Sequence, residues 1–194
     1  MQSKELSSYF ELLGVPVSWQ VDESLISSNF RKLQAQYHPD KVASGSDSER
    51  RRAVQYSSRL NDAIKTLKSP VLRAAYLLKL AGVDADMSSA TFKDPAFLMQ
   101  QMELREKLGD ITSASDPEAA LEEMFESAQA AFDDLSQEFE QRYTNKQFED
   151  AKESYAKLQF IDKLSREAEE LEHQVLDGWV IAAHLKIHSF NSLN

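Results

Sequence analysis

The chain has 194 residues, of which 42% are hydrophobic, with only 5 glycines and 5 prolines. It has no cysteine, which excludes disulfides, cysteine-ligated zinc and thiolate-bound iron–sulfur clusters. A net charge of −10 argues against binding of nucleic acid or a membrane surface by the whole chain, and no apolar run is long enough to span a bilayer. We expect a largely helical, cytoplasmic protein of one large or two small domains.

The first half predicts two antiparallel helices joined by a polar turn. Asp22 suits an N-cap, and Pro39 disfavours helical geometry at His38, so the first helix is expected to end there. A short apolar segment, Tyr9 to Leu13, is expected to pack across the pair. The apolar residues at helical spacing are Ile26, Phe30, Leu33 and Tyr37 in the first helix, and Ala53, Tyr56, Leu60, Ala63, Ile64 and Leu67 in the second.

Ser69-Pro70 predicts the start of another helix, and Gly82 predicts its end. Residues 82–93 predict a linker. The apolar positions of the helix are Leu72, Ala75, Tyr76 and Leu80.

The second half predicts a three-helix bundle. Asp94-Pro95 and Asp116-Pro117 are start signals, and the last helix is expected to run from Lys146 to Leu176, with Gly178 as its end. Apolar spacing predicts two seams suited to bundle packing. These are Leu121, Phe125, Ala128, Phe132, Leu135 and Phe139, and then Ala151, Tyr155, Leu158, Ile161, Ala168, Leu171 and Val175.

The helix after Asp94 has two apolar faces. Its core stripe is Phe97, Leu104 and Leu108. A second apolar set lies away from that stripe and has an acidic margin, which favours a partner-binding surface that can repack. This set is Leu98, Met99 and Met102, with Glu103, Glu106 and Asp110. Phe160 also lies off its helix's buried direction, and is either packed under a neighbouring helix or exposed for a partner.

The triplet His38-Pro39-Asp40 has three interpretations. An acid–base pair would need a nucleophile, metal or oxyanion site, and the chain has no GxSxG, HExxH or glycine-rich phosphate loop. Chance occurrence in a purely structural helical protein is the second. The third is a docking turn for an acidic protein surface, favoured by nearby cations. Those cations are Arg31, Lys32 and Lys41.

Two other patterns receive simpler interpretations. The three arginines at 50–52 are expected to form a solvated helix face rather than a phosphate site. His184 and His188 are four residues apart, but two imidazoles alone make a poor metal site. We therefore predict no metal, cofactor or catalytic residue.

The stretch FRKLQAQYHPDK, followed by SSRLNDAIKTLKSPVLRAAYLL, resembles a J-domain over residues 7–81. The resemblance implies that His38, Pro39 and Asp40 form a loop that stimulates ATP hydrolysis by a chaperone of the seventy-kilodalton heat-shock class. It makes Arg31, Lys32 and Lys41 auxiliary contacts.

The segments DPAFLMQQMELREKL and LQFIDKLSREAEELE resemble the C-terminal domain of the HscB co-chaperones. This implies delivery of the iron–sulfur scaffold protein IscU to the chaperone HscA. The absence of an N-terminal cysteine module points to the bacterial type. The scaffold-binding face would comprise Leu98, Met99, Met102, Glu103, Glu106, Asp110 and Phe160.

Together these patterns predict an all-α co-chaperone that is not an enzyme. We expect a J-domain at residues 1–81, a linker at 82–93, a scaffold-binding domain at 94–177 and a weakly ordered tail at 178–194. A J-protein with a different client remains the alternative.

Overall fold

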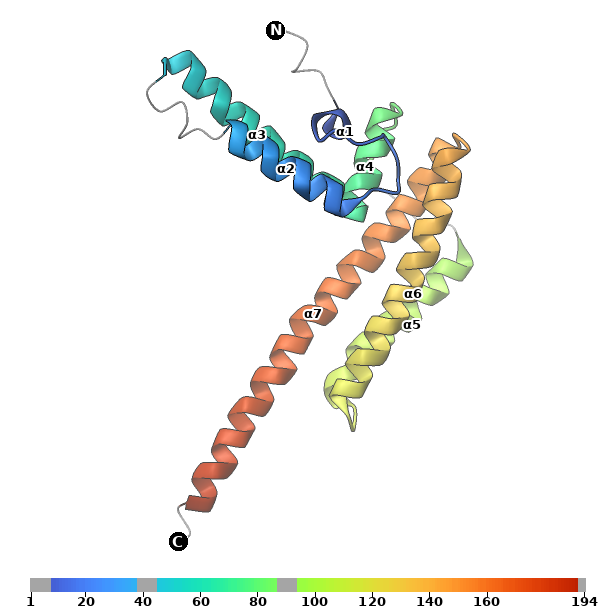
Figure 1. Cartoon of the computed structure of the whole chain (residues 1–194). Coiled ribbons are helices and arrows are strands. Elements are labelled where there is room, and N and C mark those ends of the chain that lie inside the picture. The colour runs from blue at the N-terminus through green and yellow to red at the C-terminus, as the bar shows by residue number, and fades with distance from the viewer. Residues whose placement is uncertain (1–7, 38–44, 87–93, 192–194) are drawn as a thin grey trace. The chain divides into compact units, whose positions relative to one another are not determined.

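The structure, a computed structural model, describes residues 8–37, 45–86 and 94–191, and side chains as far as residue 175 (Figure 1). Every regular element in these ranges is a helix. The chain divides into two compact units, Met1–Ala85 and Asp86–Asn194, and the division falls within the predicted linker. No helix of the described part is long and apolar enough to cross a membrane.

The described residues of the first unit form α1 (Tyr9–Leu12), α2 (Glu23–Tyr37), α3 (Asp47–Lys68) and α4 (Pro70–Leu80). The α2 and α3 helices lie alongside each other, and α1 and α4 both pack on α3 (Figure 1). The fully buried large side chains of this unit are Phe10, Leu13, Ile26, Leu60, Leu67, Leu77 and Leu78.

Local chemistry fixes where these helices begin. The Asp22 carboxylate accepts a hydrogen bond from the Leu25 amide at 2.9 Å, as its position before the apolar pattern predicts. Ser46 and Glu49 form a reciprocal capping box at the start of α3. The α2 helix is described as far as Tyr37, and the end predicted at His38 from Pro39 lies outside the described residues.

Arg73 is a buried polar anchor of the first unit, with 6% of its surface exposed. Its guanidinium donates to the carbonyls of Leu67 at 2.8 Å and Trp19 at 2.7 Å, and it lies over the Trp19 ring at 5.4 Å. Because both carbonyls accept from one charged group, the segment between α1 and α2 is tied to the α3–α4 junction.

The second unit contains α5 (Pro95–Asp110), the short 3₁₀ helix η2 (Ile111–Ser113), α6 (Pro117–Thr144) and α7 (Phe148–Asn191). A tight turn joins α6 to α7, which run antiparallel and form the main contact of the unit, and α5 packs on both (Figure 1). The predicted all-α fold is therefore confirmed.

The last helix differs from its prediction at both ends. Lys146 adopts a left-handed conformation with φ of 60°, so it belongs to the turn and α7 starts at Phe148. The helix then continues through Gly178 to Asn191, so the predicted end at Gly178 is wrong. One interior glycine costs only about 1 kcal/mol relative to alanine, and no proline follows to stop the helix.

Two predicted apolar faces are also displaced. In α6, Met124 and Ala131 are buried while Phe125 and Phe132 are half-buried. The reason is that α6 packs on both α5 and α7, so its buried stripe is centred between them. In α4, Leu72 and Leu80 are exposed, and the buried residues are Val71, Arg73, Ala74, Leu77 and Leu78.

Candidate partner-binding surfaces

The outer face of α5 exposes the predicted apolar set. Leu98 is 41% exposed, Met99 63% and Met102 73%. Exposed methionine side chains leave apolar surface in contact with water, which is unfavourable. A partner that covers this surface gains the free energy of removing it from water. The three carboxylates of the predicted margin, Glu103, Glu106 and Asp110, are exposed as well.

The opposite face of α5 is held by both long helices. Phe97 and Leu104 are buried, as predicted, and Leu108 is half-buried. On one side, the Arg105 guanidinium forms an ion pair with the Glu167 carboxylate of α7, with an N–O distance of 3.3 Å. On the other side, the Lys107 ammonium forms an ion pair with the Glu123 carboxylate of α6, with an N–O distance of 2.9 Å. Buried apolar side chains therefore pack α5 against its neighbours, with an exposed ion pair on each flank, while its outer face stays in solvent.

Phe160 packs under α5 from α7. Its ring meets Phe97 edge-on at 5.9 Å, and the Arg105 guanidinium lies 5.3 Å from its centre. The side chain remains half-buried rather than covered. Of the two alternatives left open by the sequence, packing under a neighbouring helix is the one observed. On a helical wheel, Leu98 and Arg105 lie on the same side of α5, toward α7.

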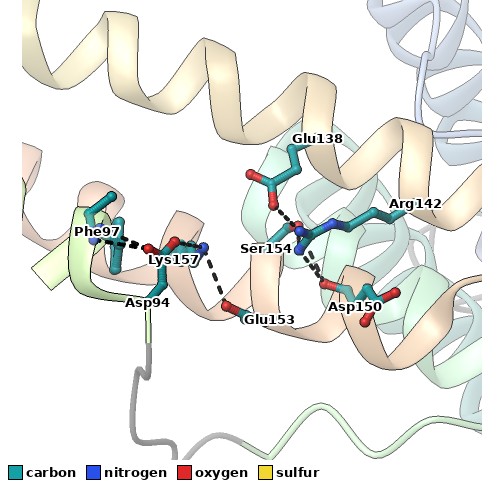
Figure 2. A network of polar contacts seen from close by, with 9 residues as sticks. Asp94, Phe97, Glu138, Arg142, Asp150, Glu153, Ser154 and Lys157 are labelled. Atoms are coloured by element: carbon teal, nitrogen blue, oxygen red, sulfur yellow. Dashed lines mark hydrogen bonds and ion pairs between the residues drawn. The ribbon is translucent and has the colours of Figure 1, made fainter.

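The start of α5 is joined to α7 by a buried lysine that sequence reasoning missed (Figure 2). Lys157 is 4% exposed, and its Nζ donates to Asp94 at 2.7 Å and lies 3.3 Å from Glu153. The same Nζ lies 5.4 Å from the centre of the Phe97 ring. The available signal was a lysine within the apolar run Tyr155 to Leu158, where a cation needs a partner.

Charge pairing sets the protonation of this network. Burial disfavours the ammonium of Lys157, but hydrogen bonds and nearby carboxylates, including Glu138, outweigh it and raise its pKa. The pKa of Asp94 is lowered, first by the hydrogen bond from Lys157 and then by the Phe97 amide. Both groups are therefore charged at neutral pH. Asp94 also caps α5, accepting from the amides of Ala96 and Phe97 at 3.0 and 3.3 Å.

We expect Asp94→Asn to lower the melting temperature at neutral pH and to matter less in acid. Because the folded-state pKa of Asp94 is depressed, its contribution is complete above the ordinary aspartate pKa of about 3.9 and is lost as the pH falls below that value. Thermal unfolding followed by circular dichroism from pH 7 to 3 should show the two proteins converging. Glu149→Gln, at an exposed position, is the control. A difference that stays constant over this range would contradict the assignment.

The first unit carries an exposed basic surface on its helical pair. Arg31 and Lys32 are exposed on α2. At the start of α3, Arg50 pairs with Asp47, and the arginines at 51 and 52 are exposed, as a solvated face requires. The four other predicted chaperone contacts, His38, Pro39, Asp40 and Lys41, lie outside the described residues.

An aromatic pair joins the two helices at the end nearest that triplet. The rings of Tyr37 and Tyr56 lie 4.4 Å apart at a tilt of 55°. This contact packs the last described turn of α2 against α3. Within the residues that the structure covers, no cluster of three or more histidine, aspartate or glutamate side chains could hold a metal ion.

Comparisons with known families agree with both halves. Residues 8–76 match the family described as the DnaJ domain, and residues 93–169 match the HSCB C-terminal oligomerisation domain. The fold is thus that of a J-domain co-chaperone.

Matches to individual proteins show which family of J-domain co-chaperones the chain belongs to. The chain is 43% identical over 169 residues to the co-chaperone protein HscB homolog of Aliivibrio salmonicida, which covers 87% of this chain and 99% of that protein. The structure of chaperone HscB from Vibrio cholerae aligns with a TM-score of 0.78 at 41% identity, over 87% of this chain and 99% of that one. Human co-chaperone HscB aligns with a TM-score of 0.79 at 28% identity, over 86% and 83%. The chain belongs to the HscB family of co-chaperones, which act in iron–sulfur cluster assembly.

Proposed function

We propose that this chain binds an IscU-type iron–sulfur scaffold protein through the outer face of α5, delivers it to an HscA-type chaperone, and stimulates the ATPase of that chaperone through His38, Pro39 and Asp40. The site of action is the cytoplasm. The single observation that carries the proposal is the exposure of Leu98, Met99 and Met102 on a helix that is otherwise packed on two sides, in a chain of this family.

The charge distribution supports a different partner for each unit. Residues 1–81 hold 12 lysines and arginines against 8 acidic residues, whereas the rest of the chain holds 10 against 24. A basic J-domain suits an acidic docking surface on the chaperone, and the exposed Arg31 and Lys32 are suited to steer that encounter. The acidic second unit suits a client with cationic groups near its apolar contact.

The proposed mechanism is that of an adaptor. A chain that holds the client in one unit and engages the chaperone with the other raises the effective concentration of client at the chaperone. ATP hydrolysis takes place in the chaperone, so this chain needs no nucleotide site. Hydrolysis, triggered at the His38-Pro39-Asp40 loop, then closes the chaperone on the client.

Titration calorimetry against the scaffold tests the client half. We expect the triple substitution Leu98→Ala, Met99→Ala and Met102→Ala to weaken binding at least about tenfold, equivalent to ~1.4 kcal/mol, because these side chains would be covered by the partner. All three are exposed, so the fold should be unaffected. Val54→Ala, which trims an exposed valine of the first unit, is the control.

The same titration distinguishes the proposed function from its main alternative, a J-protein with a different client. Tight binding of the scaffold that is unchanged in the triple variant would remove α5 from the interface. No binding of the scaffold by the unmodified chain would favour a J-protein with a different client. In that case the proposed function of the J-domain would be unaffected, and the exposed α5 face would bind another protein.

A further inference from the structure

A groove between α5 and α6 adjoins the exposed face of α5. Its volume is about 580 Å³. The floor is apolar, formed by Phe97, Ala131 and Leu135, each less than 10% exposed. Met99 and Glu103 line it from α5, and both also belong to the proposed scaffold-binding face. The groove is therefore continuous with that face and extends it onto α6.

Carboxylates dominate the charge of this groove. Among the described residues, Asp94, Glu103, Asp134 and Glu138 line it against one cation, Lys157. Lys157 is committed to Asp94 and Glu153, and Glu138 is paired with Arg142 at 2.6 Å (Figure 2). Glu103 and Asp134 remain, exposed and on different helices, without an ion pair among the described residues.

We propose that this groove receives a lysine or arginine side chain of the scaffold protein, with its aliphatic stem on the apolar floor and its charged head near Glu103 and Asp134. This inference rests on the proposed function, because it assigns part of the same client to a second wall of the interface. Lysine and arginine have an apolar stem and a charged tip, which matches an apolar floor beneath carboxylates. The same carboxylates repel phosphate groups, so the surface suits neither nucleic acid nor an anionic membrane.

Asp134 is the residue that distinguishes this groove from the outer face of α5. It lies on α6 rather than on α5, and its side chain is exposed. Its neighbour Asp133 is also exposed and accepts a hydrogen bond from Gln129 within α6. Asp133 does not line the groove, so Asp133→Asn removes the same charge from the same turn and provides a matched control.

The test is titration of the full-length chain with an IscU-type scaffold at low and high salt. We expect Asp134→Asn to weaken binding by roughly three- to tenfold at low salt, and less at high salt because exposed charges are screened. Asp134→Glu should retain most of the affinity, and Asp133→Asn should bind like the unmodified chain. Equal affinity of Asp134→Asn and Asp133→Asn at low salt would overturn the inference.

A second arm identifies the cation. Lysines and arginines of the scaffold, each replaced by glutamine, are combined with Asp134→Asn in double-mutant cycles. We expect one of them to show coupling, so that its loss costs little once Asp134 is gone. Additive effects for all of them would overturn the inference, while weakening by the triple α5 substitution in the same assay would leave the proposed function intact. No binding by the unmodified chain would overturn both.

Discussion

Lys157→Ala is expected to lower the free energy of unfolding of the second unit by about 2 to 4 kcal/mol. The substitution removes a buried aliphatic stem, the cation over Phe97, and the partner of both Asp94 and Glu153. These two carboxylates are partly exposed, so water takes up part of the lost interaction and the cost stays below that of a fully buried pair. Urea unfolding followed by circular dichroism measures the change.

Lys157→Met separates the two contributions. It keeps an unbranched, buried aliphatic stem and removes the charge and the hydrogen bond to Asp94, so we expect it to cost less than Lys157→Ala. Both variants should also weaken scaffold binding, since the start of α5 is tied to α7 through this residue. A Lys157→Ala chain as stable as the unmodified one would show that the Asp94–Lys157 contact does not hold α5.

His38→Gln is expected to reduce stimulation of the chaperone ATPase at least about tenfold, equivalent to ~1.4 kcal/mol of activation free energy. The expectation rests on the J-domain family match and on the position of His38 directly after α2. Steady-state ATP hydrolysis by the purified chaperone, with increasing amounts of this chain, measures the effect. Affinity for the scaffold should not change, because the substitution lies in the other unit.

The control is the same substitution at an exposed histidine of the second unit. His173→Gln leaves the J-domain untouched and should stimulate like the unmodified chain. If His38→Gln stimulates as well as His173→Gln does, the triplet is not the element that the chaperone recognises.

Helix order and the starts of most helices were predictable from the sequence because local chemistry determines them. The Asp22 side chain caps the start of α2, and Ser69 with Pro70 at the first position starts α4, as local sequence predicts. Which face of α4 is buried was not predictable. Apolar residues fill nearly all of that helix, so spacing alone could not decide between Leu72 and Val71.

The candidate site likewise has features that were predictable from the sequence and features that were not. Exposure of Met99 and Met102 followed from wheel positions on α5 and is confirmed. The Asp94–Lys157 pair and the groove beside Asp134 were not predictable, because each joins residues from different helices. Contacts between helices depend on how α5 packs on α6 and α7, which periodicity within one helix does not specify.

In the proposed function, one chain couples client binding to the ATPase of the chaperone. The most direct measurement is ATP hydrolysis by the chaperone with a fixed, low amount of this chain and increasing scaffold protein. We expect scaffold to raise the rate with the unmodified chain. The triple substitution at Leu98, Met99 and Met102 should require much more scaffold for the same rise, and His38→Gln should give no rise. A rise of equal size and midpoint in all three chains would contradict the proposed function.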